Sequence, residues 1–390
     1  MLSKKLKGAL LTASLVLSSL ITPLTASAQE TWTIAGNLEL TGNAAAYATP
    51  VSRSMELAVE QVNANGGILE GDQLAIEVID NKSDTTEATS VARRISEIQN
   101  LVGIIGPNST TLGHAITPTV SEGEAPMIYT STTGDGLTLD DAGTAIKNIF
   151  RVCFENSYQG AIAGEYAMSK LDAPKAVVII DQAMDYSQGL ADAFVAKYEE
   201  LGGEVVSYEA YQSGDADFQA LATTLASYDF DVIYLPGYYT ETGLIVKQIR
   251  EMGLTQPIIG GDGYANETFV ELAGSHNLND LYITSHYYDQ TDRPEAQEFI
   301  AAYEEKFGER PDSFAALGYD AIMLLVDAIE RAGTTEAAAV NKALQETTDY
   351  AGVTGDFTMN ANHNPDKPAI MLEYQGGEVV SAEEITTDYE

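Results

Sequence analysis

Hydroxyl-bearing residues gather directly after two apolar runs in the first half of the chain. The hexapeptide GPNSTT at 106–111 follows the apolar run 101–105, and TSTT at 130–133 follows the run 126–129. A turn of this composition that opens a helix presents amide hydrogens and the positive end of the helix dipole, which attract an anion. The pattern therefore predicts a site for a carboxylate or phosphate. Helix capping is the alternative, because such turns often do only that.

A carboxylate and two tyrosines occupy comparable places in the second half of the chain. Asp262 lies in the glycine-lined turn GGDG at 260–263, after the apolar run 257–259, and Tyr186 and Tyr238 also follow apolar runs. An aspartate between glycines is commonly a turn residue, and a tyrosine at a strand end commonly packs against its neighbours. Anion donors in one half and a carboxylate in the other would together suit a zwitterion.

Motifs typical of enzymes are missing from the sequence. It has no P-loop, no G-x-G-x-x-G after the first strand and no G-x-S-x-G elbow. The asparagine-rich stretch 356–366 hints at a calcium loop, but the glycine and terminal glutamate of that motif are absent, which favours a turn. The histidines show no metal-ligand spacing and are expected to be surface or structural residues: His114, His276, His286 and His363. We therefore expect no catalytic residue, no metal site and no cofactor.

The elements that would position these residues are strands alternating with helices. Predicted strands of the first half lie at 31–40, 74–79, 101–105 and 126–129, with helices at 51–65, at 84–99 and from 109 onward. Predicted strands of the second half lie at 176–180, 205–208, 232–235, 257–259 and 281–284, with helices between them. This alternation predicts two wound units, each a parallel sheet covered by helices, with ligands at the carboxyl ends of the strands.

Length, charge and cysteine content narrow the class of protein. The 390 residues, 45% of them hydrophobic, exceed what one core usually organises, so two domains are expected. The 58 acidic residues outnumber the 20 basic ones and give a net charge of −38, which argues against nucleic acid or anionic lipid as a partner. Cys153 is the only cysteine, so no intramolecular disulfide can form.

The first 28 residues have the features of a secretion signal. Lys4, Lys5 and Lys7 precede an apolar stretch at 9–24, and the small residues ASA at 26–28 form a cleavage site. That stretch is too short and too polar for a membrane span, and no later segment approaches about 18 uninterrupted apolar residues. Because the only cysteine lies far from the cleavage point, no lipid anchor is expected. The sequence predicts a soluble protein, released into a periplasm after cleavage near Ala28.

Six motifs, taken together and in order, resemble those of one known family. They are GNAAAY at 42–47, VNANGGI at 62–68, IGPNST at 105–110, DYSQG at 185–189, DF at 217–218 and LGYDA at 317–321. The chain resembles, over nearly its whole mature length, the periplasmic binding proteins of branched-chain amino acid transporters, of the Leu/Ile/Val-binding type. Each motif alone is weak, but their order and spacing are specific.

This resemblance implies an α/β fold of two wound α/β lobes joined by three crossings, a type I periplasmic binding protein-like architecture. The crossings would fall near Phe154, Ser285 and Thr358. The first lobe would comprise 29–154 and 286–358, and the second would comprise 155–285 and 359–390. The two lobes would close around a ligand by a hinge motion.

The resemblance also implies a role for each candidate side chain. Ser109 and Thr133 would hold the α-carboxylate of an amino acid, and the backbone at Ser131 would help to bind its ammonium. Asp262 would pair with that ammonium. The other candidates would line the site: Tyr47, Asn108, Tyr186, Tyr238 and Phe314.

The chain departs from the family pattern at two places. Asp262 stands where the Leu/Ile/Val binders have a longer glutamate, so the reach toward the ammonium differs. Pro107 and Asn108 replace an apolar pair beside the serine, which predicts a more polar side-chain pocket.

The function implied is capture of an amino acid, branched-chain or similar, and its delivery as a monomer to the membrane permease of an ABC importer. The alternative is a ligand sensor of the same fold that binds an amide or another small organic molecule and docks on a signalling receptor. A sugar-binding relative would offer a stacking tryptophan, whereas the sole tryptophan, Trp32, begins the first strand.

Overall fold

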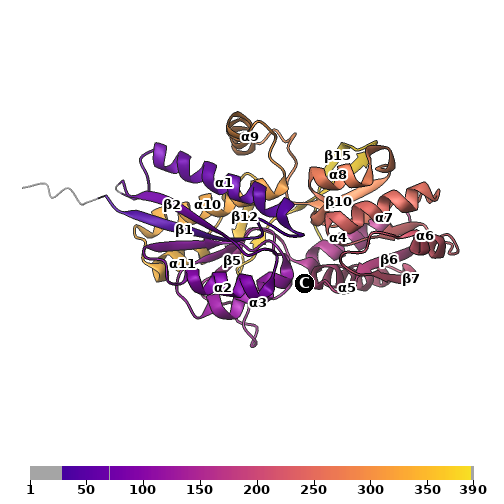
Figure 1. Ribbon diagram of the computed structural model, residues 1–390, viewed down its shortest axis with the longest axis horizontal. Coiled ribbons are helices and arrows are strands. Elements are labelled where there is room, and N and C mark those ends of the chain that lie inside the picture. The colour runs from indigo at the N-terminus through magenta and orange to yellow at the C-terminus, as the bar shows by residue number, and fades with distance from the viewer. Residues whose placement is uncertain (1–28, 70, 388–390) are drawn as a thin grey trace, which may run out of the picture.

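The computed structural model describes residues 29–69 and 71–387, so the expected secretion signal at 1–28 lies outside the described residues. Figure 1 shows two α/β bodies side by side. We call the body built on a five-stranded sheet the first lobe and the body built on a seven-stranded sheet the second lobe. Within the described residues, no helix is both long and apolar enough to cross a membrane.

The sheet of the first lobe is entirely parallel, in the order β2-β1-β3-β4-β5. Its strands are β1 (Thr31–Leu38), β2 (Gln73–Asp80), β3 (Leu101–Ile105), β4 (Met127–Tyr129) and β5 (Ile149–Arg151). One face is covered by α1 (Ala45–Ala64), α10 (Ser313–Ala332) and α11 (Ala337–Gln345), and the other by α2 (Thr85–Ile95) and α3 (Thr110–Ser121). Ile34 packs with the first group and its neighbour Ala35 with the second, as the two-residue period of a strand requires.

The sheet of the second lobe has the order β15-β14-β10-β9-β8-β6-β7. Five strands are parallel: β6 (Lys175–Asp181), β7 (Glu204–Tyr211), β8 (Val232–Tyr234), β9 (Ile258–Gly260) and β10 (Leu281–Ser285). Two antiparallel strands, β14 (Ala369–Gln375) and β15 (Glu378–Ile385), extend this sheet beside β10. Helices α4 (Asn156–Ser169) and α5 (Asp185–Glu200) cover one face, and α6 (Gln219–Leu225), α7 (Tyr239–Glu251) and α8 (Glu267–Ala273) cover the other.

The remaining elements are short or peripheral. Beside the first lobe lie α9 (Pro294–Phe307) and a small antiparallel sheet of β11 (Tyr350–Gly352), β12 (Gly355–Met359) and β13 (Pro365–Asp366). Two short 3-10 turns, η1 (Asp262–Tyr264) and η2 (Ser275–Asn277), belong to the second lobe. One parallel and one mainly parallel sheet, each with helices on both faces, confirm the predicted α/β fold of two wound units.

Candidate ligand-binding site

Residues that follow strands of both sheets meet at one small cavity between the lobes. Seven of the nine side chains singled out from the sequence line it, together with Gly263: Tyr47, Asn108, Ser131, Tyr186, Tyr238, Asp262 and Phe314. The other two, Ser109 and Thr133, are buried next to this lining along the chain but do not form part of it. The rule that ligands bind beyond the carboxyl ends of parallel strands selected five of these seven residues, and the family resemblance supplied Tyr47 and Phe314.

Asp262 begins η1, directly after β9 and Gly261, and the residue is only 3% exposed. Oδ1 accepts hydrogen bonds from the Tyr186 hydroxyl at 2.7 Å and from Gln159 Nε2 at 3.0 Å. Oδ2 lies 3.2 Å from Nε2 of His286. These donors are neutral when His286 is neutral, and within the described residues no lysine or arginine comes within ion-pair distance of the carboxylate. The geometry suits a carboxylate that binds a cationic group from a ligand.

Gln159 and His286 are the two members of this network that sequence reasoning missed. Gln159 lies on α4, a helix that was not predicted, and its Oε1 also accepts from the backbone N–H of Asp262 at 2.7 Å. His286 follows the last residue of β10, so the strand-end rule that found Asp262 could also have found it. Of the two expectations for the histidines, surface or structural, His286 fits only the second, because it is 1% exposed and its ring stacks on Phe154 at 3.6 Å.

Burial makes His286 sensitive to acid. Loss of solvation lowers its pKa to about 4, although the hydrogen bond and the charge of Asp262 act in the opposite direction, and the positive charge of Lys367 adds a smaller downward effect. An unfolded histidine has a pKa of about 6.5. The folded protein therefore binds fewer protons than the unfolded chain between these two values.

The contribution of neutral His286 to the free energy of unfolding is consequently fully present above about pH 6.5. It is lost as the pH falls toward 4, by roughly 3 kcal/mol in all. Glutamine at position 286 keeps an N–H donor for Asp262 but cannot take up this proton. We therefore expect the melting temperature of His286→Gln to fall less than that of the parent between about pH 7 and pH 4.5. Thermal unfolding at several pH values measures this difference. An identical loss in both proteins would contradict it.

On the first lobe, a buried glutamate occupies the turn expected to bind an anion. Glu39, which follows β1 and is fully buried, accepts from the backbone N–H groups of Asn108 and Ser109 at 3.0 Å each. Burial raises the pKa of Glu39, and these hydrogen bonds partly oppose that rise. The amides of Asn108 and Ser109 are therefore not free for a ligand, contrary to the expectation for this turn. A ligand carboxylate would need donors other than these two amides.

Asn108 is held by its neighbours on both ends of its amide. Its Nδ2 donates to Glu39 at 2.9 Å, and its Oδ1 accepts from the hydroxyls of Thr130 at 2.8 Å and Ser131 at 3.2 Å. The two lone pairs of Oδ1 are thus both used within the lobe, which leaves one amide hydrogen for the cavity. Asn108 makes the cavity less polar than its residue type suggests.

Two hydroxyl groups are left to receive an anion. The Thr133 hydroxyl is buried and has no hydrogen-bond partner within the described residues. A buried hydroxyl without a partner is unfavourable, which makes it a natural donor to a ligand. The Ser109 hydroxyl lies in hydrogen-bonding range of Tyr238, which belongs to the other lobe.

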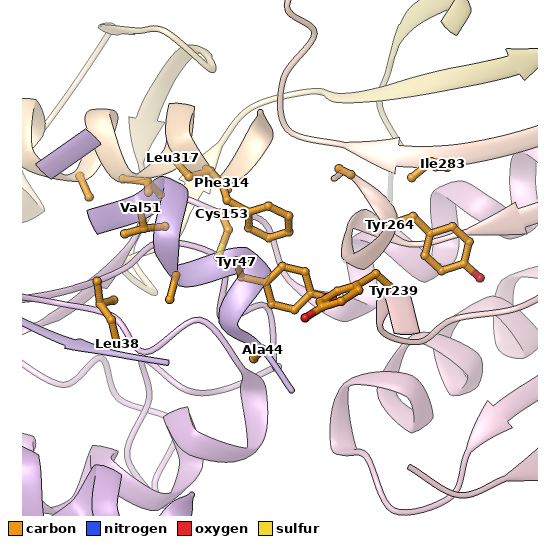
Figure 2. Packing of buried hydrophobic residues seen from close by; sticks show 14 of the residues in the cluster. Leu38, Ala44, Tyr47, Val51, Cys153, Tyr239, Tyr264, Ile283, Phe314 and Leu317 are labelled. Carbon is orange, nitrogen blue, oxygen red and sulfur yellow. The ribbon is translucent and has the colours of Figure 1, made fainter. Parts of the chain in front are cut away.

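Aromatic rings fill most of the space between the lobes. The ring of Tyr47 lies 4.5 Å from that of Phe314 and 5.2 Å from those of Tyr238 and Tyr239, and Tyr186 lies 5.2 Å from Tyr238. Figure 2 shows Tyr47 and Phe314 reaching from the first lobe toward Tyr239 of the second.

The lobes are in direct contact, so this is a closed arrangement. The Tyr47 hydroxyl donates to the carbonyl of Gly263 across the gap at 2.9 Å. The remaining free space is about 10 Å³, which is about enough for one water molecule. An amino acid can therefore enter only when the lobes separate.

A larger cavity lies elsewhere in the molecule and does not compete with this site. Its volume is about 660 Å³, and its lining includes Phe154, Asn364 and Lys367. It brings together the segment after β5, the β12–β13 turn and the residues that follow β15 rather than the strand ends of both sheets. Among the residues that the structure describes, no cluster of three or more His, Cys, Asp or Glu side chains could hold a metal ion.

Comparison with known proteins gives consistent results. A sequence model of the periplasmic binding protein family matches residues 31–378. The chain is 30% identical to Leu/Ile/Val-binding protein homolog 3 of Brucella melitensis over 348 residues, which are 88% of this chain and 91% of that protein. It is 29% identical to the Leu/Ile/Val-binding protein BraC3 of Rhizobium johnstonii, over 96% of this chain and 99% of that protein.

Solved structures with the same architecture include two whose names also refer to the binding of branched-chain amino acids. The branched-chain amino acid transporter substrate-binding protein LivJ of Streptococcus pneumoniae, solved in complex with isoleucine, is 37% identical with a TM-score of 0.86, and the match covers 92% of this chain and 100% of that one. The leucine-binding protein LivK of Thermotoga maritima is 32% identical with a TM-score of 0.84, covering 92% of this chain and 99% of that one.

Proposed function

Because the chain belongs to the periplasmic binding protein family, we propose that it is an extracytoplasmic solute-binding protein that captures an amino acid by lobe closure and delivers it to an ABC importer. The observation that carries this proposal is the meeting of Asp262 from one lobe with Asn108 and Ser131 from the other at a single closed cavity. Like the relatives it matches, the protein is a binding protein and not an enzyme.

The proposed ligands are the branched-chain amino acids leucine, isoleucine and valine. The names of the relatives support this choice, and LivJ of Streptococcus pneumoniae was solved with isoleucine. The cavity supports it independently, because ring surfaces of Tyr47, Tyr238 and Phe314 dominate its walls and would pack against an aliphatic side chain. The sensor alternative has no comparable support.

We assign the polar groups as follows. The hydroxyls of Ser109 and Thr133 receive the ligand α-carboxylate, and Asp262 together with the backbone at Ser131 binds the ammonium. Tyr186 and Tyr238 form the wall on the second lobe. The support for Asp262 is its buried position and its neutral partners, and the support for Thr133 is its unpartnered buried hydroxyl.

We propose lobe boundaries close to those implied by the resemblance, with crossings near Phe154 and Ser285. For the third crossing we favour the stretch between Asp366 and Ala369 over Thr358. The ring of His363 still stacks on Phe150 of the first lobe at 4.3 Å, and β14 of the second lobe begins at Ala369.

The family places the protein outside the cytoplasm. We propose further that a signal cleaved near Ala28 directs it to a periplasm and that it acts there as a monomer. Its proposed partner is the membrane permease of an amino acid importer.

A thermal-shift screen tests the proposed function. A ligand that binds only the folded protein stabilises it by mass action, by about 2.7 kcal/mol when its concentration is 100 times its dissociation constant. We expect L-isoleucine, L-leucine and L-valine to raise the melting temperature, whereas D-isoleucine and L-glutamate leave it unchanged. If none of the twenty amino acids raises the melting temperature, the proposed function is wrong.

A further inference from the structure

Arg151 is a cation with no exposed surface that lies outside the lining of the candidate site. It ends β5, and its side chain is fully buried. Its Nη1 donates to two main-chain carbonyls, those of Thr132 at 3.3 Å and Gly134 at 2.9 Å. The two carbonyls flank Thr133, so one guanidinium fixes the chain on both sides of that residue.

Other bonds complete the hold on this loop. The carbonyl of Thr133 accepts from the backbone N–H of Asn156 at 2.7 Å, and the N–H of Gly134 donates to the Thr110 hydroxyl at 3.1 Å. Because a peptide unit is planar and trans, a carbonyl of Thr132 that faces Arg151 turns the N–H of Thr133 away from it. The backbone is thus held on both sides of Thr133, while the buried hydroxyl of Thr133 has no partner within the described residues.

The charge of Arg151 is only partly balanced. Its one acidic partner among the residues that the structure describes is Glu155, which Nη2 reaches at 3.4 Å and which keeps 25% of its side chain exposed. Glu155 also accepts from the N–H of Gly136 at 3.2 Å and from Asn364 Nδ2 at 2.8 Å. Solvent and these donors weaken its hold on Arg151, and a guanidinium stays protonated in proteins. Positive potential therefore remains beneath the loop 132–134.

We propose that Arg151 is the positioning residue for the ligand carboxylate: it orients Thr133 through the two flanking carbonyls and supplies positive potential behind the hydroxyl. This inference rests on the proposed function, because it requires a carboxylate at Thr133. It also accounts for anion binding on this lobe although Glu39 occupies the amides of the neighbouring turn.

A purely supporting role for Arg151 in the core makes a different prediction. A support would affect every ligand alike, whereas a group that acts on the carboxylate affects only ligands that carry one. L-isoleucine and L-isoleucinamide separate the two cases, because at about pH 6 both carry a protonated amine and only the first carries a negative charge.

Calorimetric titration of both ligands into the parent, Arg151→Met and Arg151→Lys gives the test. We expect the parent to prefer isoleucine to its amide by about 100-fold or more, and Arg151→Met to reduce this preference about tenfold, mainly by weakening isoleucine. Arg151→Lys keeps the charge but cannot span both carbonyls, so it should retain most of the preference. Equal weakening of both ligands in Arg151→Met would overturn the inference.

Glu155→Gln is the second variant, needed in case Arg151→Met does not fold. It removes the charge that balances Arg151 and leaves the guanidinium in place, so the preference for isoleucine over its amide should widen by about two- to threefold. An unchanged or narrower preference would contradict the inference. A parent protein that binds both ligands equally would instead overturn the proposed function, since no carboxylate would then be recognised.

Discussion

Asp262→Asn should bind isoleucine so weakly that calorimetry of the variant detects little or no heat. A closed cleft excludes water, so a ligand ammonium without its carboxylate loses a charge-assisted hydrogen bond and stays desolvated. Truncating one member of such a buried pair typically weakens binding by about 2–5 kcal/mol, which is roughly 30-fold to several thousand-fold in affinity.

The surroundings of Asp262 allow this substitution without unfolding. The Oδ1 position keeps its donors, the hydroxyl of Tyr186 and the amide of Gln159. A new Nδ2 at the Oδ2 position would face His286 Nε2, which can accept if its proton moves to Nδ1, an atom without a partner within the described residues. We therefore expect the melting temperature of the ligand-free protein to change little.

Asp192→Asn is the matched control, since Asp192 is an exposed aspartate on α5 of the same lobe. It should bind isoleucine as the parent does. If Asp262→Asn also binds as tightly as the parent, Asp262 is only a turn residue and the amino-acid assignment loses its main electrostatic support.

Substitution of Tyr186 should produce the second largest loss of affinity. Its hydroxyl donates to Asp262 and accepts from the N–H of Gly263 at 3.0 Å, and its ring packs on Tyr238. Tyr186→Phe removes only the hydroxyl, so Asp262 and the N–H of Gly263 each lose one buried hydrogen bond. We expect the binding free energy to weaken by about 1–3 kcal/mol, or roughly 5- to 150-fold in affinity. Tyr186→Ala also removes the wall and should weaken binding further.

Calorimetry with isoleucine measures both variants, and circular dichroism checks that they are folded. Tyr208→Ala, which truncates a half-exposed tyrosine on β7, is the matched control and should leave affinity unchanged. Parental affinity in a folded Tyr186→Ala would return Tyr186 to a packing role.

The frame of the molecule was predictable because its strands are short, apolar and buried on both faces. β3, β6 and β8 coincide with the predicted strands within one residue at each end. The strand-end rule then selected Asp262, Asn108 and Ser131 without any knowledge of contacts.

Helix α4 could not be predicted from the sequence, because it is buried on most sides and carries small residues instead of one apolar stripe. It packs so closely on α5 that a Cβ at Gly160 would lie 2.5 Å from the carbonyl oxygen of Leu190. A helix of this kind lacks the amphipathic period on which sequence prediction depends. Gln159 was missed with it.

The occupant of the α3 turn was unpredictable for another reason. The sequence shows that a turn offers amides to an anion, but it does not show which carboxylate takes them. Glu39 lies about seventy positions away along the chain and reaches the turn only because β1 and β3 are neighbours in the sheet. The start of α1 was likewise misplaced: the helix begins at Ala45 rather than at 51 and includes Pro50, although a proline beyond the first turn removes a helical hydrogen bond.

Small-angle scattering of the parent and of Asp262→Asn, each with and without saturating L-isoleucine, tests most directly whether an amino acid is captured between the lobes. Groups on separate lobes converge on one ligand only in a closed form, and a ligand shifts the equilibrium toward the form it binds better. We predict a smaller radius of gyration with isoleucine in the parent and no change in the variant. A radius of the parent that isoleucine leaves unchanged, at a concentration where calorimetry shows binding, would contradict capture by lobe closure.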